Sequence, residues 1–248
     1  MRKFGLIGYP LSHSISKKFF SQKFETEHIE NTAYELYPIE NISLLQRLLL
    51  ENPTLEGLNV TIPYKLEVLP FLNEVDEAAR IIGAVNCIKI NTSDSNTFLK
   101  GYNTDAYGFE ESLKPLLEHG HNKALVLGDG GAAKAVKYVL DKLEIPFIVV
   151  TRRATDTSIL YEDLTADILS EYQIIINTTS LGMSPDVISC PAIPYELLTA
   201  KHLVYDLVYN PEETTFLNKA RIKGAKIKNG LEMLYLQAER SWYLWNSL

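Results

Sequence analysis

Side chains suited to acid–base chemistry stand in this sequence just after short apolar stretches. Lys65 closes the segment NVTIPYK, and Asp105 closes GYNTD. An ammonium beside a carbonyl oxygen that gains negative charge could supply a proton or a stabilising field, and a carboxylate could orient that ammonium or hold a hydroxyl. A single lysine or aspartate in such a place is usually a surface charge, so the interpretation depends on the polar residues around the two.

Uncharged polar residues recur at positions of the same kind. Ser14 and Ser16 lie two apart, so in an extended segment both hydroxyls could donate to one anion. One of them could equally cap the helix expected to follow. Asn59 and Thr61 share one face of an expected strand, and Asn86 ends the turn GAVN. Several polar groups at strand ends, next to a glycine-rich segment, favour a pocket for a small polar ligand.

That glycine-rich segment, LVLGDGGAA at 125–133, runs from a buried-type strand into a helix. Gly128, Gly130 and Ala133 fit the pattern G-x-G-x-x-G/A of dinucleotide-binding folds. In this pattern Gly128 allows the tight turn and Gly130 lets a pyrophosphate approach the backbone. The helix N-terminus supplies N–H groups and partial positive charge. The segment predicts nucleotide binding; the alternative is a tight turn that binds nothing.

Two arginines, Arg152 and Arg153, follow the next expected strand. A site for NAD usually has an acid here, which accepts a hydrogen bond from the ribose 2′-hydroxyl. Guanidinium groups suit a 2′-phosphate instead, because they offer forked donors and stay charged. The pattern therefore favours NADP over NAD. The alternative is that the arginines are solvated surface charges, which Asp156 would partly neutralise.

The elements that must position these residues alternate between strand and helix patterns. In the first hundred residues strand patterns lie at 3–7, 33–39, 58–62, 85–90 and 97–101, and helical ones at 16–28, 42–50 and 76–82. This alternation predicts an α/β domain with a largely parallel sheet. A second unit is expected from about residue 103, with helices at 107–119 and 132–143, strands at 123–127, 147–151, 174–177 and 203–207, and a last helix at 230–245.

Length and composition exclude several classes of protein. The chain has 248 residues, of which 46% are hydrophobic and 22% charged, and its formal net charge is −7. It is long enough for one large or two modest domains, and the lack of a Lys/Arg-rich run argues against a nucleic-acid partner. Neither a signal peptide nor a membrane-spanning stretch is expected, which predicts a cytoplasmic protein. Two cysteines and five histidines form no ligand-spaced cluster, so neither a disulfide framework nor a metal is expected.

Taken together, the motifs resemble the shikimate dehydrogenase family over nearly the whole chain and in the same order. The matching segments are SHSIS (12–16), NVTIPYK (59–65), GAVN (83–86), NTD (103–105), GDGGA (128–132), INTTSLGM (176–183), YDLVYNPEET (205–214) and NGLEMLYLQ (229–237). The resemblance implies an NADP-dependent enzyme that reversibly reduces 3-dehydroshikimate to shikimate in aromatic amino-acid (chorismate) biosynthesis. It implies an N-terminal α/β substrate-binding domain at 1–101, with the C-terminal helix 230–248 packing back on it, and a Rossmann-type NADP-binding domain at 102–229.

The resemblance also implies roles for individual residues, with Lys65 and Asp105 matching the catalytic pair. Positions that match substrate-binding groups are Ser14 and Ser16 for the carboxylate, Thr61, Asn86 and Gln237 for the ring hydroxyls, and also Asp105 and Tyr209. Positions that match the cofactor site are Gly128, Gly130, Gly131, Ala132, Thr151, Arg152, Arg153, Leu207, Gly230 and Met233. Which member of the catalytic pair is the formal acid or base stays open, and the resemblance permits both monomers and homodimers.

The chain departs from the family pattern after the second strand of the nucleotide domain. The family usually has N-R-T-x-x-R/K there, whereas TRRATD at 151–156 lacks the last basic residue. An NAD-preferring quinate/shikimate dehydrogenase is therefore one alternative. A second is a non-catalytic module that senses shikimate, although the presence of both Lys65 and Asp105 argues against it. A third is a dinucleotide-binding protein with an unrelated substrate, which would make the ordered polar motifs a coincidence.

Overall fold

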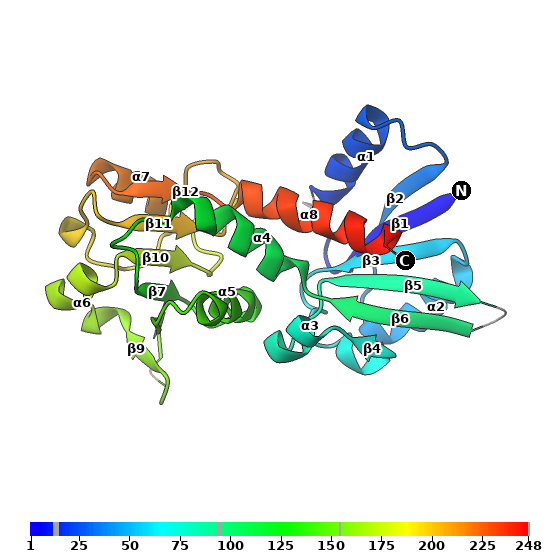
Figure 1. Cartoon of the computed structure of the whole chain (residues 1–248), viewed down its shortest axis with the longest axis horizontal. Helices are drawn as coiled ribbons and strands as arrows, with labels where there is room; N and C mark the ends of the chain where they lie inside the picture. The colour runs from blue at the N-terminus through cyan, green and yellow to red at the C-terminus, as the bar shows by residue number, and fades with distance from the viewer. Residues whose placement is uncertain (12–14, 94–95, 154, 248) are drawn as a thin grey trace. The chain divides into compact units, whose positions relative to one another are not determined.

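The computed structural model of the chain describes residues 1–11, 15–93, 96–153 and 155–247 (Figure 1). It divides into two compact units, of which the first comprises Met1–Thr104 with Gln237–Leu248 and the second Asp105–Leu236. Each unit contains its own six-stranded sheet. None of the described helices has both the length and the apolar content needed to cross a membrane.

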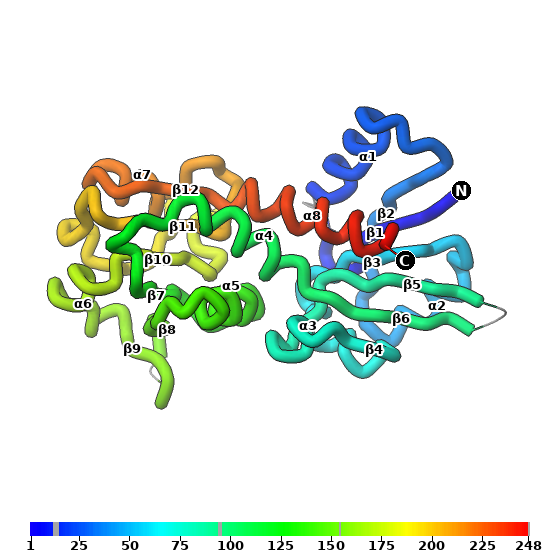
Figure 2. Tube along the Cα trace, viewed as in Figure 1, coloured from blue at the N-terminus to red at the C-terminus, as the bar shows by residue number. Residues whose placement is uncertain are grey.

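The sheet of the first unit is mixed, with strand order β2-β1-β3-β5-β6-β4. Its strands are β1 (Arg2–Gly8), β2 (Thr32–Pro38), β3 (Leu55–Val60), β4 (Glu74–Val75), β5 (Cys87–Ser93) and β6 (Asn96–Tyr102). β1 pairs in parallel with β2 and β3, whereas β5 pairs antiparallel with β3 and with β6, its neighbour in Figure 2. Three of the five pairings are parallel, that of β4 with β6 among them, so the prediction of a largely parallel sheet is confirmed. The exception is β5, whose short connection to β6 allows only an antiparallel pair.

Helices of the first unit are α1 (Ser16–Thr26), α2 (Leu45–Glu51) and α3 (Glu77–Ile82). The sequence sets both ends of α3: the Asp76 carboxylate accepts from the Ala78 N–H (3.1 Å), and Gly83 ends the helix with φ of 68°. Alternate residues of β1 enter two hydrophobic clusters. Phe4 belongs to one and Ile7 to the other, as the two-residue period of a strand requires.

The C-terminal helix α8 (Leu231–Asn246) is shared between the units, because its residues from Gln237 onward belong to the first. The Trp245 ring stacks on Phe4, with 4.9 Å between ring centroids and 25° between the planes. Its Nε1–H donates to the Ile88 carbonyl (2.9 Å). These contacts confirm the prediction that the C-terminal helix packs on the first domain.

The sheet of the second unit is entirely parallel, with strand order β12-β11-β10-β7-β8-β9. Its strands are β7 (Ala124–Leu127), β8 (Phe147–Thr151), β9 (Ser158–Leu160), β10 (Ile174–Asn177), β11 (Leu203–Asp206) and β12 (Lys226–Lys228). Counted from β7, this is the order 3-2-1-4-5-6 of dinucleotide-binding folds. Strands β7, β10 and β11 are buried along their whole length, as covered faces require. The prediction of a Rossmann-type domain is confirmed.

The remaining α-helices are α4 (Thr104–Leu113), α5 (Gly131–Lys142), α6 (Ala166–Glu171) and α7 (Thr215–Ile222). The helix expected at 107–119 starts three residues earlier and ends at Leu113, because Pro115 stands in the tighter turn that follows. The strand expected at 58–62 ends at Val60. Thr61 therefore lies beyond the strand and does not share a strand face with Asn59.

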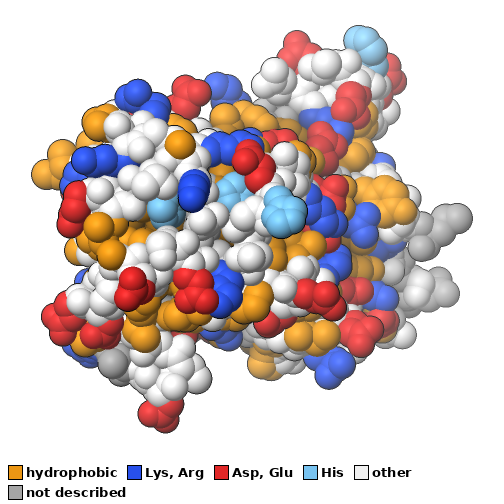
Figure 3. All heavy atoms as spheres, turned by 60° about the vertical axis from the view of Figure 1, so that its left-hand side comes forward, with side chains coloured by type: hydrophobic (Ala, Val, Ile, Leu, Met, Phe, Trp, Pro, Cys, Tyr) orange, Lys and Arg blue, Asp and Glu red, His pale blue; other side chains and the backbone are white. Residues whose placement is uncertain are grey.

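Acidic and basic side chains are interspersed over the face of the second unit that Figure 3 brings forward. Several form surface ion pairs, among them Lys226 with Glu118 (3.1 Å) and Arg221 with Glu213 (3.0 Å). Such exposed pairs stabilise a fold by only about 0–1 kcal/mol each. The stability of this unit therefore depends mainly on its buried strands and helices.

Candidate functional site

The strand order of the second sheet reverses between β7 and β10, and folds of this class bind ligands outside the carboxyl ends of such strands. Gly128 follows β7 there, with φ of 95°, a conformation that residues with side chains disfavour. A Cβ at this position would lie 2.6 Å from Cγ2 of Thr179. The Gly128 N–H donates to the Val150 carbonyl (2.8 Å), which holds the turn against β8. Both backbone conformation and space therefore require glycine.

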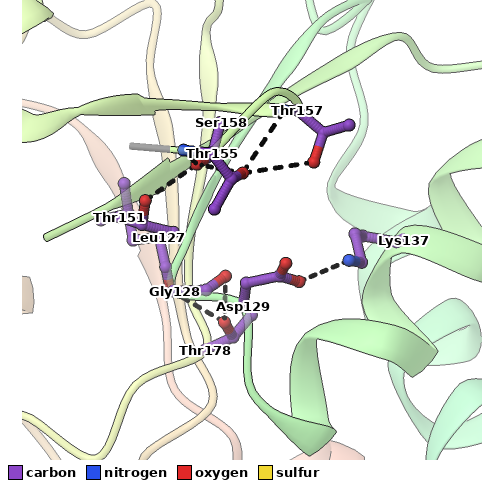
Figure 4. Close-up of polar contacts among 9 residues, drawn as sticks. All are labelled: Leu127, Gly128, Asp129, Lys137, Thr151, Thr155, Thr157, Ser158 and Thr178. Atoms are coloured by element: carbon purple, nitrogen blue, oxygen red, sulfur yellow. Dashed lines mark hydrogen bonds and ion pairs between the residues drawn. The ribbon is translucent and has the colours of Figure 1, made fainter. Parts of the chain in front are cut away.

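The next two glycines face open space. Gly130 is the N-cap of α5, the helix has no side-chain cap, and a Cβ on Gly130 or Gly131 would meet no described atom within 4 Å. A diphosphate could approach the helix N–H groups through this space. Ala132 follows and is partly buried. The Asp129 carboxylate points toward Lys137 of α5 and forms an ion pair with it, which neutralises the acidic side chain of the turn (Figure 4).

The turn after β8 presents two guanidinium groups at the same edge of the sheet. Arg152 and Arg153 are both exposed. Thr151 Oγ1 donates to the Arg153 carbonyl (2.8 Å) and lies 3.0 Å from Ser158 Oγ, at the start of β9. Ser158 Oγ also accepts from the Thr155 N–H (3.1 Å), as Figure 4 shows. Hydroxyl hydrogen bonds thus shape the turn that carries the arginines.

Four other residues predicted to line the site lie after β11 or near the start of α8. They are Leu207, Tyr209, Gly230 and Met233. The Gly230 N–H donates to the Val208 carbonyl (3.2 Å), and a Cβ on Gly230 would lie 2.7 Å from the carbonyl carbon of Leu207. Close approach of two backbones therefore requires this glycine. Tyr209 is partly buried, which raises the pKa of its phenol, and Met233 is buried.

Uncharged polar residues meet in a buried cluster in the first unit. Asn86 Oδ1 accepts from the Thr104 N–H (2.6 Å), while Asn86 Nδ2 donates to Thr104 Oγ1 (3.0 Å) and to Gln237 Oε1 (3.4 Å). Thr104 Oγ1 also lies 3.1 Å from Ser241 Oγ. The structure thus brings together Asn86 and Gln237, which are 151 positions apart in the chain.

The cluster continues to one of the predicted serines, Ser16, through Asn59 and Tyr34. The Asn59 amide donates to Ser241 Oγ (2.9 Å), and its Oδ1 accepts from the Tyr34 hydroxyl (2.9 Å). Burial raises the pKa of Tyr34 well above its usual value, and a hydrogen bond with Ser16 opposes that rise. Ser16 is the first residue of α1, where the helical pattern at 16–28 predicted a helix to begin, so of the two alternatives for the serines the extended one does not apply to Ser16. Ser14 lies outside the described residues.

The two predicted catalytic residues belong to different units. Lys65 is partly buried in the turn after β3, and its carbonyl accepts from the Val85 N–H (2.8 Å). Asp105, also partly buried, stands in the first turn of α4. Thr61 is partly buried as well, and its N–H donates to the Ile7 carbonyl (3.0 Å).

No role had been predicted from the sequence for Thr104, Ser241 or Asp206. Thr104 stands inside the NTD motif, and Ser241 lies one helical turn after Gln237, so both had a recognisable signal. Asp206 ends a buried strand and is 0% exposed, and burial raises the pKa of its carboxyl to about 6. A charged residue at the end of an apolar strand was the signal there. Among the described residues no group of three or more His, Cys, Asp or Glu is placed to hold a metal ion.

Comparison with known proteins identifies the family. The family model for the shikimate dehydrogenase substrate binding domain matches residues 6–88. The chain is 39% identical to the shikimate dehydrogenase (NADP(+)) of Caldanaerobacter subterraneus subsp. tengcongensis, over 98% of this chain and 90% of that one. A crystal structure of shikimate 5-dehydrogenase from Thermus thermophilus, in complex with NADP(H) and shikimate, superposes with a TM-score of 0.86 at 32% identity, over 100% and 94% of the chains. A chorismate mutase/shikimate 5-dehydrogenase fusion protein from Clostridium acetobutylicum gives 0.85 at 38% identity, over 99% and 91%. This chain belongs to the shikimate dehydrogenase family.

Proposed function

We propose that this chain is an NADP-dependent shikimate dehydrogenase, which catalyses the reversible reduction of 3-dehydroshikimate to shikimate in aromatic amino-acid (chorismate) biosynthesis. The observation that carries the proposal is 39% identity to an NADP(+) shikimate dehydrogenase over 98% of the chain. The glycine turn at the strand-order reversal supports it independently, because a dinucleotide needs such a turn.

The second unit fits the cofactor. The open space over Gly130 and Gly131 admits a pyrophosphate, and the exposed Arg152 and Arg153 follow the strand that faces the adenosine ribose in this fold class. When bound, NADPH supplies the hydride that reduces the ketone. The part of the protein is to hold and orient the dinucleotide and to keep water away from it. We assign this role to residues 102–229.

The first unit fits a small ring that carries several hydroxyl groups. Asn86 and Gln237 belong to a cluster of amides and hydroxyls, each of which can donate and accept. We propose that these two residues and Thr61 bind the ring hydroxyls, and that Ser14 and Ser16 bind the carboxylate. Residues 1–101 with the helix 230–248 are accordingly assigned to substrate binding.

Lys65 and Asp105 are proposed to act on the carbonyl that is reduced. Negative charge grows on the carbonyl oxygen during the reduction, and the Lys65 ammonium would stabilise it and donate the proton that completes the alcohol. The Asp105 carboxylate would accept a hydrogen bond from a substrate hydroxyl and orient the ammonium. Tyr209 is proposed to close the same site beside the substrate.

One observation favours a second candidate, an NAD-preferring quinate/shikimate dehydrogenase. Asp156 stands exposed in the turn after β8, where the family pattern has a basic residue. Its negative charge would repel a 2′-phosphate bound at Arg152 and would weaken the preference for NADP.

The test is the oxidation of shikimate or quinate by the purified full-length chain at alkaline pH, with NADP⁺ and NAD⁺ in parallel, followed by the absorbance of the reduced nicotinamide. We expect rapid reduction of NADP⁺ by shikimate. In Arg152→Ala we expect KM for NADP⁺ to rise about 10- to 100-fold with little change for NAD⁺, because a charged contact is lost. Arg221→Ala, which removes an exposed guanidinium of α7 in the same unit, serves as the control.

Comparable rates with NAD⁺ or quinate would establish the second candidate. No reduction by either cofactor, in a folded chain that still binds shikimate, would contradict both candidates and indicate a sensor module.

A further inference from the structure

The buried carboxylate of Asp206 takes no part in the reaction proposed above. Its Oδ1 accepts from Asn177 Nδ2 (2.9 Å) and from the Val208 N–H (3.0 Å), and its Oδ2 accepts from Thr214 Oγ1 (2.6 Å). These donors are all neutral. The residue ends β11, which is separated by β10 from the strand-order reversal where ligands bind in this fold class.

Two of these donors, the Val208 N–H and Thr214 Oγ1, hold a loop at both of its ends. Val208 is the second residue after Asp206, and Thr214 is the N-cap of α7, so one carboxylate fixes the start and the finish of residues 207–214. The Leu207 N–H donates to the Asn177 carbonyl (3.0 Å), which ties the same loop to β10. The loop is therefore built around Asp206.

Asn177 extends this network to the glycine turn. Its Oδ1 accepts from the Thr179 N–H (3.0 Å) and from Thr179 Oγ1 (2.7 Å). The Thr179 methyl group lies against Gly128, and Thr178 Oγ1 donates to the Leu127 carbonyl (2.8 Å). Hydrogen bonds and packing thus connect Asp206, through β10, to the turn proposed to bind pyrophosphate.

We propose that Asp206 is a positioning residue for the dinucleotide, and that it holds the loop of residues 207–214 in place relative to the glycine turn. This inference rests on the proposed function. In this fold class a dinucleotide lies across the reversal point, with its adenosine half over the strand after the glycine turn and its other half over the opposite strands. Asp206 and its loop lie on the side of β10 and β11, so they would support the nicotinamide half. Hydrogen bonds to a charged acceptor are the strong ones, which suits a group that fixes a loop.

The test is Asp206→Asn in the full-length chain, with direct titration of NADP⁺ and, separately, of 2′,5′-ADP, the adenosine half alone. The amide keeps the side-chain volume and still accepts from Asn177 or Val208, but it loses the charge and cannot accept from Thr214 at its nitrogen. We expect the Kd for NADP⁺ to rise about tenfold while the Kd for 2′,5′-ADP stays unchanged. Asp167→Asn, which alters an exposed carboxylate in the first turn of α6, is the matched control and should change neither constant.

A second pair of variants separates positioning from general loss of structure. Thr214→Val removes the hydroxyl that donates to Asp206 and should weaken NADP⁺ binding in the same way, whereas Thr214→Ser keeps the hydroxyl and should preserve binding. Equal weakening of NADP⁺ and 2′,5′-ADP in Asp206→Asn would show that the residue merely supports the unit, and this would overturn the inference. Unchanged NADP⁺ binding would overturn it as well. Failure of the wild-type chain to bind any dinucleotide would instead overturn the proposed function and this inference with it.

Discussion

The backbone at Lys65 is fixed by hydrogen bonds within the protein itself. The Lys65 carbonyl accepts from the Val85 N–H (2.8 Å), and the preceding Tyr64 is buried, with its hydroxyl donating to the Ile39 carbonyl (2.6 Å). Less conformational freedom is lost when the Lys65 side chain binds a substrate, because the backbone that carries it is already fixed. This placement suits the role proposed for Lys65 as the group that stabilises and protonates the carbonyl oxygen.

Replacing Lys65 by alanine should therefore lower kcat far more than it raises KM. We expect kcat to fall about 10²- to 10⁴-fold, the usual range for loss of a positioned proton donor. Steady-state kinetics with shikimate and NADP⁺ measures both constants. Arg47→Ala, which removes an exposed cation from α2 of the same unit, should leave both unchanged. Near-normal turnover in a folded Lys65→Ala protein would remove Lys65 from the chemistry.

Residues with several ordinary uses could not be assigned from the sequence. Threonine and serine cap helices, bind backbone groups or bind ligands, so the positions of Thr104 and Ser241 near predicted site residues did not by themselves assign a role to either. The contacts of Thr104 with Asn86, Gln237 and Ser241 appear only when residues from distant parts of the chain meet. Lys65 and Asp105 were recognisable because a resemblance to a family supplied the order of several motifs.

At the scale of elements, the C-terminal part of α8 completes the first unit. Trp245 lies in one hydrophobic cluster with Phe4, Phe20 and Tyr34. Its ring also fills the space beside Gly57 of β3, where a Cβ would collide with it. A segment from the end of the chain thus covers strands from its beginning, and its packing holds Gln237 beside Asn86.

Trp245→Ala should destabilise the first unit by about 3–5 kcal/mol, because it removes a large buried side chain and leaves a cavity. Urea unfolding monitored by circular dichroism measures the loss. Tyr243→Ala changes an aromatic residue of the same helix that is 59% exposed, and it should alter the free energy of unfolding by less than about 0.5 kcal/mol. Equal effects of the two substitutions would contradict the packing role of Trp245.

The accuracy with which an element was predicted depended on its length, because a longer element shows more repeats of its hydrophobic pattern. The buried strands β7, β10 and β11 and the amphipathic helix α5 were predicted within a residue or two, because their apolar runs or periodicity are local. β9 and β12 have three residues each and were not predicted. Strands of that length contain too few alternations to be distinguished from loops, and only their partners in the sheet identify them.

At the scale of the whole molecule, two buried acids, Asp206 and Glu110, make the free energy of unfolding depend on pH in opposite directions. Burial raises the pKa of Asp206 to about 6 in the folded chain. For Glu110, burial also raises the pKa, but hydrogen bonds from Lys114 and Lys142 outweigh it and hold the pKa below the usual value. The folded chain thus binds a proton at Asp206 more tightly than the unfolded chain does, and at Glu110 less tightly. Rising pH therefore removes stability at Asp206 and adds it at Glu110.

The ordinary pKa of an aspartate carboxyl is 3.8. The stabilisation that protonated Asp206 gives the folded chain should be fully present below that pH and should be lost as the pH rises through about 6. The difference corresponds to roughly 3 kcal/mol, at about 1.4 kcal/mol for each pH unit. Urea unfolding of the wild type and of Asp206→Asn, from about pH 4 to about pH 7, should show the wild type losing stability relative to the variant. Glu110 and the other acids cancel in this comparison. A difference that does not change with pH would contradict the prediction.

The sequence by itself determined the glycine turn, the parallel sheet that holds it and the helix that follows, because each depends on local periodicity and on the backbone freedom of glycine. It also determined the family, through motifs in a fixed order. Only the tertiary structure decided which polar residues contact one another. Asn86 and Gln237 lie 151 positions apart, and Asp206 gains three neutral donors from β10, from its own loop and from the start of α7. No local pattern encodes such contacts, because they arise only when separate elements pack together.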